Sequence, residues 1–326
     1  MLYYYLPTHK NSLEQSSFFI EDGSHVPIIS HTLNEYILKY KKQLDDHQHE
    51  WDNMKRITNP YEFIHSQVYG GPGAVATLKP LSRSFFKMIE LCHDFKLCID
   101  YDKNINTFHL AEGPGGFIEA ISYIRHNLAD TYYGMTLIDD NPSVPAWKKS
   151  DKFLNNNPNV IIEKGPSGTG DLFLVENLLH CNNNYRNKME LITADGGFDF
   201  SDNFNEQESS ATKLLLAEVI FAITMQKSGG SFVLKIFDIM TKATIDILYL
   251  LSCFYDNVIV CKPLTSRIAN SEKYIICKGF HIPKNYDSFM NYIFSNYENI
   301  ISLTNIASIF TFTHNLIFIS KIEEIN

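Results

Sequence analysis

The segment Thr107–Glu119, with the sequence TFHLAEGPGGFIE, constrains the fold of this chain more than any other stretch. Thr107 to Ala111 has the apolar character of a short buried strand, and residues 112–116 form a glycine-rich turn. From Phe117 onward, apolar residues recur at the spacing of a helix that packs on a sheet. This order is typical of the first crossover in an open α/β sheet, where ligands bind at the carboxyl ends of the strands.

The same turn excludes two common nucleotide sites. Residues 112–117 do not match G-x-G-x-x-G, the pattern of dinucleotide-binding turns, and no G-K-[ST] follows as in a P-loop. The glycines would let the backbone approach a bulky ligand, and Glu112 could accept a hydrogen bond from a hydroxyl or amino group. Such a turn also occurs where it only packs a helix against a strand, so a ligand site needs support from other residues.

Strands and helices are predicted to alternate after this crossover. Further strands are predicted at Tyr132–Ile138, Asn159–Glu163, Met189–Ala194, Gly230–Phe237, Asn257–Lys262 and Tyr274–Cys277. Helices are predicted at Ser82–Phe95, Asp171–His180 and Thr241–Tyr255, with a long amphipathic helix at Glu208–Lys227 and a polar loop at Asp139–Asn157. Because two strands follow one another at the end, we expect an α/β fold whose sheet is seven-stranded and mostly parallel, with an antiparallel edge strand and helices on both faces.

The flanking regions carry weaker signals. Met1–Ile29 reads as irregular, His31–Ile57 as a helix with a polar face, and Pro60–Val68 as a second short helix. Gly70–Gly73 reads as a linker or a loop on the substrate side. The tail from His281 has apolar periodicity and is expected to pack back on the domain.

Composition bounds the possible partners. The hydrophobic content of 44% and charged content of 20% are those of a globular chain, and the net charge is -9. Any nucleic-acid contact must therefore come from a local basic patch. The six cysteines form no C-x-x-C pair, which favours reduced residues over disulfides or a zinc site. We expect a soluble intracellular protein in the cytoplasm or nucleus, since no signal peptide is evident and the apolar run Leu214–Met225 is short and contains Glu218.

Four charged residues are predicted to meet at one cleft. Lys87 lies on the apolar-striped helix before the first strand of the crossover, and Asp195 ends the strand Met189–Ala194. Lys235 lies inside an apolar strand, where a lysine is costly unless it is paired or near the strand's end. Glu272 comes just before the last strand. Each residue alone is ordinary, as a surface lysine, a turn aspartate or a surface glutamate.

Together, these four residues suit methyl transfer from a sulfonium to a ribose hydroxyl. The hydroxyl needs a base, and a lysine can be that base if burial and a neighbouring cation lower its pKa. The two carboxylates oppose this shift, so the sequence leaves the direction of the net pKa change open.

The order and spacing of seven segments resemble the FtsJ-like (RrmJ-type) ribose 2′-O-methyltransferases, particularly the cap-specific mRNA branch as found in large DNA viruses. The resemblance covers about residues 80–280. The segments are Ser82–Leu91, His109–Ala120, Tyr133–Leu137, Gly168–Leu172, Ala194–Phe200, Leu234–Asp238 and Ser266–Phe280. It implies a Rossmann-like methyltransferase domain at 80–280, flanked by an N-terminal extension (1–79) and a C-terminal segment (281–326).

The resemblance also implies a K-D-K-E catalytic tetrad at Lys87, Asp195, Lys235 and Glu272. Lys235 would be the general base, Lys87 and Asp195 would hold the hydroxyl, and Glu272 would position Lys235. S-adenosyl-L-methionine is implied as the cofactor. Its implied contacts are Glu112, Gly113, Pro114, Gly115, Gly116, Phe117, Asp171 near the adenine, and Asp195. An acidic residue for the cofactor ribose is expected after the second strand, where this chain has Thr136-Leu137 and only later Asp139-Asp140.

The implied partner is RNA, most specifically 5′-capped mRNA. Arg267 and Asn270 precede Glu272 and could touch RNA, while Lys79 and Arg83 lie on the approach to Lys87. Solvated loop charges are the alternative for each. A cap would stack on aromatic rings, for which the candidates are Tyr69, Phe85, Trp147 and Phe200. His93 beside Cys92 has no partners at the spacing of metal ligands, so no metal site is expected.

Three alternatives remain open at the level of sequence. The same chemistry could act on ribosomal or transfer RNA, although the long flanks favour a cap substrate. A non-catalytic RNA-binding subunit with this fold would have little reason to keep all four residues of the tetrad. A nicotinamide oxidoreductase is disfavoured because the G-x-G-x-x-G turn is missing.

Overall fold

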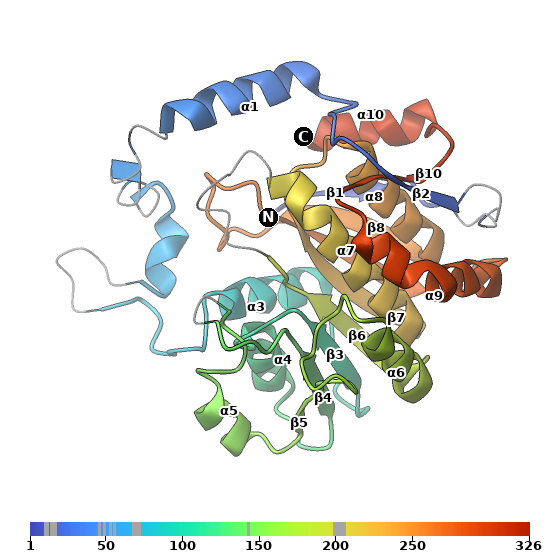
Figure 1. Cartoon of the computed structure of the whole chain (residues 1–326). Coiled ribbons are helices and arrows are strands. Elements are labelled where there is room, and N and C mark those ends of the chain that lie inside the picture. Colours follow the sequence, from blue (N-terminus) through green and yellow to red (C-terminus); the bar gives the residue numbers. More distant parts are fainter. Residues whose placement is uncertain are drawn as a thin grey trace.

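The computed structural model describes residues 1–9, 13, 18–44, 47, 50–51, 54, 57–66, 73–98, 100–141, 144–197 and 207–326. Its centre is an eight-stranded sheet with the order β1-β8-β9-β7-β6-β3-β4-β5 (Figure 1). These strands are β1 (Leu2–Leu6), β3 (Asn106–Leu110), β4 (Thr131–Met135), β5 (Val160–Ile162), β6 (Met189–Ala194), β7 (Gln226–Ile236), β8 (Tyr255–Lys262) and β9 (Lys273–Phe280). A separate two-stranded sheet pairs β2 (Phe18–Asp22) with β10 (Ile306–Phe310).

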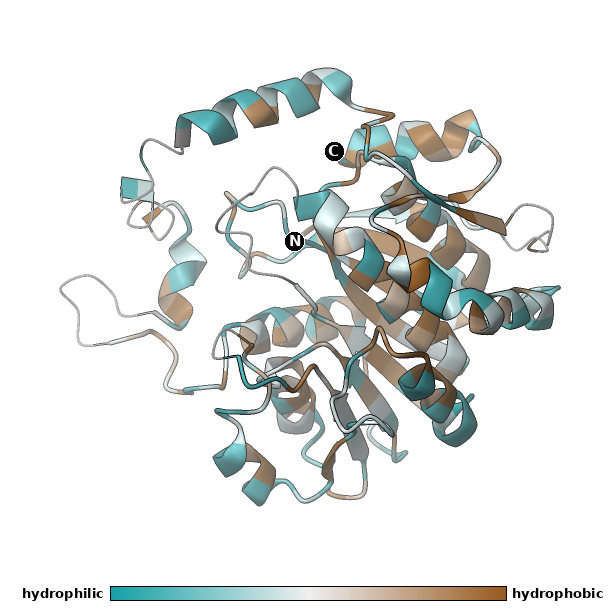
Figure 2. Cartoon of the chain, viewed as in Figure 1, coloured by the Kyte–Doolittle hydropathy of each residue, from teal (hydrophilic) through white to brown (hydrophobic). Residues whose placement is uncertain are grey.

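Helices cover both faces of the large sheet. α3 (Ser84–Phe95) and α4 (Gly116–Arg125) pack on one face, and α6 (Val175–Tyr185), α7 (Gln207–Met225) and α8 (Lys242–Phe254) pack on the other. Alternate residues of β7 divide between the two cores: Val233 joins the cluster under α3 and α4, whereas Phe232 and Leu234 join the cluster under α7 and α8. Figure 2 shows the strands and α7 largely apolar, in contrast to the mostly polar α1 (His31–Leu44).

The predicted Rossmann-like α/β class is confirmed, with two differences in the sheet. β3 to β7 are mutually parallel, but the antiparallel strand β9 lies inside the sheet, between β7 and β8, not at its edge. The edge beyond β8 is β1, which pairs antiparallel with it from Leu2↔Lys262 to Leu6↔Val258 and makes the count eight.

The prediction that Met1–Ile29 is irregular is therefore wrong. β1 pairs with β8, and β2 pairs with β10 near the other end of the chain. Both strands depend on hydrogen-bond partners more than 200 residues away, which no local pattern reveals. The polar loop expected at Asp139–Asn157 also contains a short helix, α5 (Asp151–Asn156).

The helix α7 is not amphipathic as predicted, because nearly all of its residues from Ala211 to Met225 are buried. It packs against the sheet on one side and against α6, α8 and β10 on the others. A helix that is apolar all round is a buried helix. Within the described residues, no helix combines the length and apolar character needed to cross a bilayer.

The flanking elements differ in length from their predictions. The predicted helix His31–Ile57 is observed as α1, ending at Leu44, and part of its remainder lies outside the described residues. Pro60–Val68 is observed as the 3₁₀ helix η3 (Pro60–Ile64), and most of the predicted linker Gly70–Gly73 lies outside the described residues.

The C-terminal segment contains α9 (Tyr286–Ser302), β10 and α10 (Leu316–Ile325). Asp246 of α8 ties this segment to that helix. Its carboxylate accepts hydrogen bonds from the backbone amides of Ile309 and Phe310, at 2.7 and 3.1 Å, and contacts the His314 ring at 2.5 Å. The division into an extension, a domain and a C-terminal segment stays a prediction.

A buried ion pair braces the crossover that carries the glycine turn. Arg125, at the end of α4, contacts the Asp130 carboxylate at 2.7 Å, and both side chains are fully buried. Arg125 also donates to three backbone carbonyls of residues 98–103, and Asp130 accepts from the Ile105 amide at 2.9 Å. The pair therefore holds the segment that leads into β3.

Replacing Asp130 by alanine should destabilise the protein by about 3–5 kcal/mol, because a buried guanidinium loses its partner. Urea unfolding monitored by circular dichroism measures the change. Asp100→Ala is the matched control, since its ion pair with Lys103 is exposed and should contribute little. Equal midpoints for both variants would contradict the role given to Asp130.

Candidate active site

The predicted cleft forms where the parallel strands end and β9 begins. β3 leads into the glycine turn, β6 ends just before Asp195, and Lys235 lies next to the end of β7. Because β9 runs antiparallel to β7, its first residues lie beside the last residues of β7, with Ile236↔Lys273 and Lys235↔Tyr274 in register. Glu272, one residue before β9, is thereby placed near the carboxyl ends of the parallel strands.

The four predicted residues lie together in two ion pairs. The Lys87 amine contacts the two Glu272 carboxylate oxygens at 2.7 and 2.9 Å. The Lys235 amine lies 3.3 Å from an Asp195 carboxylate oxygen and donates to the Asp195 backbone carbonyl at 2.6 Å. All four side chains are at most 13% exposed.

Tyr274 joins the two pairs. Its fully buried hydroxyl donates to the Asp195 carboxylate at 3.0 Å and lies 3.5 Å from the Lys87 amine. Tyr274 was not among the residues predicted from the sequence, although it lies in the Ser266–Phe280 motif, two positions after Glu272. Ser266, from the same motif, donates to a Glu272 carboxylate oxygen at 2.8 Å.

The direction of the pKa shift of Lys235, which the sequence left open, follows from the charges around it. Burial alone would lower the pKa of this amine, but the carboxylates of Asp195, Glu272 and Glu218 outweigh burial and raise the pKa above its usual value. In the protein without ligand the amine of Lys235 is therefore protonated at neutral pH.

Glu218 is a further carboxyl group at the site, and it was not predicted from the sequence. It lies on α7, is fully buried, and accepts a hydrogen bond from the Gly196 amide at 3.1 Å. Burial raises the pKa of Glu218 to about 8, against the opposing effect of Lys235. A carboxylate within the apolar run Leu214–Met225 was the available signal, since such a group needs a polar partner.

The glycine turn lies directly beside Asp195. Gly115 has a φ of 104°, a conformation that L side chains rarely adopt, and α4 begins at Gly116. The Asp195 amide donates to the carbonyl of Leu110 at 3.4 Å, which joins the ends of β3 and β6. The helix N-terminus suits a carboxylate, and the Asp195 side chain suits a cation. These groups fit S-adenosylmethionine, which carries both kinds of charge.

Glu112 lies beneath the turn. Its carboxylate accepts a hydrogen bond from the Phe117 amide and so caps α4, and burial raises its pKa well above the usual value. Its other oxygen, Oε2, lies 3.5 Å from the buried His109 ring. A direct contact between Glu112 and the cofactor stays a prediction.

The residues Ala146 and Trp147 occupy space that the glycines leave. A Cβ atom on Gly113 would lie 2.5 Å from the Ala146 carbonyl oxygen, and one on Gly115 would lie 3.1 Å from the Trp147 ring. The small size of these glycines thus serves internal packing. Trp147, a candidate for stacking on a cap, packs against the turn.

The predicted adenine contact, Asp171, lies in the loop that follows β5. Its carboxylate accepts a hydrogen bond from the Phe173 amide at 2.8 Å. The preceding residues lie along the end of β4, because the Ile138 amide donates to the Thr169 carbonyl at 2.7 Å. Asp139 and Asp140 are exposed beyond this point.

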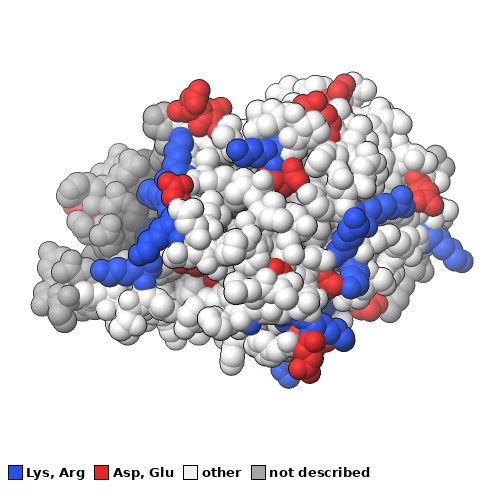
Figure 3. All heavy atoms as spheres, turned by 90° about the horizontal axis from the view of Figure 1, so that it is seen from below, with Lys and Arg blue, Asp and Glu red and all other residues white. Residues whose placement is uncertain are grey.

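The four residues predicted to contact RNA have different environments. Arg83 and Arg267 both pair with the buried Glu62 carboxylate, at 3.2 and 2.8 Å. Asn270 accepts a hydrogen bond from the Lys262 amine at 2.8 Å, and Lys79 is exposed. Figure 3 shows that the basic residues on the face seen there form separate groups and not one continuous stripe.

The stacking candidates are only partly described. Phe85 is 3% exposed and belongs to the core under α3 and α4, so it offers no free ring face. Tyr69 and Phe200 lie outside the described residues.

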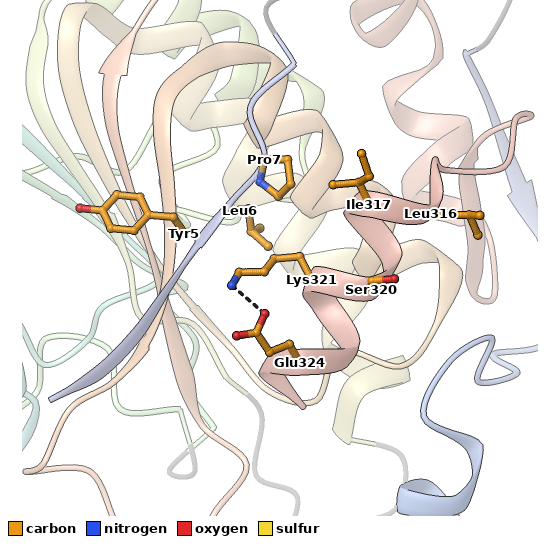
Figure 4. Close-up of a pocket in the computed structure, with 8 residues that line it drawn as sticks. All are labelled: Tyr5, Leu6, Pro7, Leu316, Ile317, Ser320, Lys321 and Glu324. Carbon is orange, nitrogen blue, oxygen red and sulfur yellow. Dashed lines mark hydrogen bonds and ion pairs between the residues drawn. The ribbon is translucent and has the colours of Figure 1, made fainter.

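A surface groove lies between β1 and α10 (Figure 4). Tyr5, Leu6, Pro7, Leu316 and Ile317 supply its apolar lining, and Lys321 and Glu324 form an ion pair within it. The strand register places the Leu6 end of β1 beside Val258, while the end nearest the cleft pairs Leu2 with Lys262. The groove contains none of the four predicted catalytic residues.

The charge on Glu272 should contribute to stability in a pH-dependent way. Burial opposes ionisation, but Lys87 and Lys235 outweigh it and lower the pKa of Glu272 to about 2. The stability that this shift contributes is present above the unfolded pKa of about 4.5 and is lost as the pH falls toward 2. It is on the order of 3 kcal/mol.

Glu272→Gln should therefore flatten the loss of unfolding free energy between about pH 6 and about pH 3, measured by urea titration. Glu176→Gln, a change at an exposed residue of α6, is the control and should keep the wild-type slope. Identical slopes for wild type and Glu272→Gln would contradict the pairing.

The sequence of this chain is similar to those of known methyltransferases. Residues 80–280 match the FtsJ-like methyltransferase family. The cap-specific mRNA (nucleoside-2′-O-)-methyltransferase 2 of Danio rerio is 29% identical over 308 residues, which cover 86% of this chain and 38% of that protein. The corresponding methyltransferase 1 of Mus musculus is 32% identical over 219 residues, covering 64% of this chain and 25% of that protein. The chain thus aligns with well under half of the length of each of these vertebrate relatives. The resemblance to viral enzymes stays a prediction.

Among solved structures, a ribosomal RNA methyltransferase of Plasmodium falciparum is similar, with a TM-score of 0.42 and 19% identity over 61% of this chain and 97% of that one. Human methyltransferase-like protein 13 is similar with a TM-score of 0.39 and 9% identity over 67% of this chain and 90% of that one. Neither likeness bears on the substrate. The family match covers more than half of the chain and includes the glycine turn and all four clustered residues. The chain therefore belongs to the FtsJ-like methyltransferase family, whose methyl donor is S-adenosyl-L-methionine.

Proposed function

We propose that this protein is an RNA 2′-O-methyltransferase that modifies the first transcribed nucleotide of capped mRNA, converting cap 0 to cap 1. The observation that carries the proposal is the convergence of the Lys87–Glu272 and Lys235–Asp195 pairs on Tyr274, beside the glycine turn. A methyl transfer to a sugar hydroxyl needs a base and a positioned hydroxyl, and this cluster contains groups for both.

In this proposal the amine of Lys235 is the general base. It takes the proton of the ribose 2′-hydroxyl while that oxygen forms a bond to the methyl carbon and the carbon–sulfur bond breaks. Lys87 and Asp195 hold the hydroxyl, and Glu272 keeps Lys87 in place through the contact at 2.7 Å. Glu272 was expected to position Lys235. In this proposal it positions Lys87, because Lys87 is its direct partner and its effect on Lys235 acts over a longer distance.

The raised pKa of Lys235 means that this amine must lose a proton before it can act as a base. Bound S-adenosylmethionine supplies the electrophilic methyl group and one positive charge, and a positive charge beside an amine lowers the amine's pKa. Gly113–Phe117 and Asp195 are the residues proposed to hold it, with Asp171 toward the adenine. The rate should rise with pH until Lys235 is neutral.

The cap substrate is supported by the names of the curated relatives from Danio rerio and Mus musculus. Because the chain spans only part of those proteins, the capped substrate and any partner belong to this proposal. Methylation of ribosomal or transfer RNA is the second candidate, since it needs the same four residues. A purely RNA-binding role would leave the buried charges without a function.

Lys235→Ala should lower the methyl-transfer rate about 10²–10⁴-fold, because the reaction loses its base. The measurement is transfer of tritium from labelled S-adenosylmethionine to capped RNA. Lys227→Ala is the matched control, a lysine of the same strand with a side chain 52% exposed, and it should keep the wild-type rate. A folded Lys235→Ala enzyme with full activity would refute the base assignment.

The same assay should separate the substrate candidates. We expect transfer to capped RNA and little transfer to the same RNA with a 5′-triphosphate. Equal methylation of both RNAs, or methylation of ribosomal or transfer RNA alone, would overturn the cap proposal. Either result would leave the proposed 2′-O-methylation chemistry in place. Failure to bind S-adenosylmethionine in calorimetry would overturn the chemistry as well.

A further inference from the structure

We propose that Asn59 and Glu62, in the segment before the matched family region, position the loop 263–272 and so set the geometry of the Lys87–Glu272 pair. This inference rests on the proposed function, since it assigns a positioning role in that reaction. Asn59 is the N-cap of η3, and Glu62 lies within η3. Neither residue touches the four clustered side chains, so each would act through the loop.

The first observation is that Glu62 binds two arginines from different parts of the site. Its carboxylate accepts from Arg267 at 2.8 and 3.1 Å and lies 3.2 Å from Arg83. Arg267 belongs to the loop that carries Glu272, and Arg83 is the N-cap residue of α3, the helix that carries Lys87. One carboxylate therefore ties together the two elements whose side chains form the ion pair.

The second observation is a buried hydrogen bond next to that contact. The Asn59 side-chain amide donates to the Ser266 carbonyl at 3.1 Å, and both residues are at most 1% exposed. The Ser266 hydroxyl in turn donates to the Glu272 carboxylate at 2.8 Å. Two steps of direct contact thus lead from the N-terminal segment to Glu272.

The loop has a further attachment to α3. The Glu90 carboxylate accepts from the backbone amides of Leu264 and Thr265 at 2.7 and 3.0 Å. This contact holds the start of the loop, whereas Asn59 and Glu62 hold Ser266 and Arg267, nearer to Glu272. Loss of the N-terminal contacts should therefore loosen the end of the loop that carries Glu272.

The Glu62 contact should persist across the working pH range. Although burial opposes ionisation, Arg267, Arg83 and His65 outweigh it and lower the pKa of Glu62 to about 2. The carboxylate is thus charged wherever the enzyme would act. The two arginines, which were candidates for RNA contact, are largely committed to this carboxylate.

The test uses the full chain with Glu62→Gln and, separately, Asn59→Ala. Steady-state kinetics on capped RNA should show that kcat falls about tenfold to a hundredfold, since a small displacement of positioned groups is enough for such a loss. The dissociation constant for S-adenosylmethionine, measured by calorimetry, should remain unchanged. Glu35→Gln, an exposed glutamate of α1, is the matched control for removing a carboxylate from the N-terminal segment.

Amide hydrogen exchange supplies a readout that does not depend on activity. In both variants, exchange should rise in residues 263–272 and stay unchanged in β6 and α4. Unchanged kcat, or unchanged exchange in the loop, would overturn the proposal. If Glu62→Gln does not fold, Asn59→Ala decides. If the wild-type protein methylates no RNA, the proposed function fails, and the exchange data still report whether these residues hold the loop.

Discussion

The buried pair between Lys87 and Glu272 is the interaction on which the site depends. An ammonium and a carboxylate that are this little exposed are tolerated only because each satisfies the other, with Ser266 and Tyr274 nearby to complete the hydrogen bonding. The pair joins a helix on one face of the sheet to a loop at the end of its strands. Its geometry therefore requires that α3, β9 and the loop before β9 are all correctly packed.

The antiparallel insertion of β9 is what brings this pair to the other one. In a purely parallel sheet, the residue before a strand lies at the amino ends of the strands, on the side opposite to the site. β9 runs against β7, so the residues before it lie at the carboxyl ends of β6 and β7, where Asp195 and Lys235 are found. Tyr274 then lies opposite Lys235, and its hydroxyl reaches both Asp195 and Lys87. The strand order thus accounts for the composition of the charge cluster.

The cluster also explains why burial alone does not set the charge of the proposed base. Lys235 is surrounded by three carboxyl groups, which stabilise its ammonium form more than burial destabilises it. Without ligand, such a site keeps the Lys235 amine protonated at neutral pH. In the proposed reaction, this property couples the chemistry of Lys235 to binding of a cationic methyl donor, and Asp195 and Glu272 contribute more to it than Glu218 does.

Much of the fold and the four clustered residues could be predicted from sequence. Apolar runs and turn residues act over short distances along the chain. They were therefore enough to predict the strand–turn–helix at Thr107–Glu119, the end of β6 and the position of the lysine within β7. The presence of β1 and β2, the burial of α7 and the interior place of β9 could not be read in this way. Each depends on partners supplied by distant parts of the chain.

The sequence by itself determined which chemical groups are available and in what order they occur along the chain. Only the tertiary structure decided their pairing: Lys87 with Glu272, Lys235 with Asp195, and both Arg83 and Arg267 with Glu62 instead of with solvent. The physical reason is that ion pairs and pKa values depend on distance and burial. Both are set by strand register and helix packing, which residues far apart in the chain establish together.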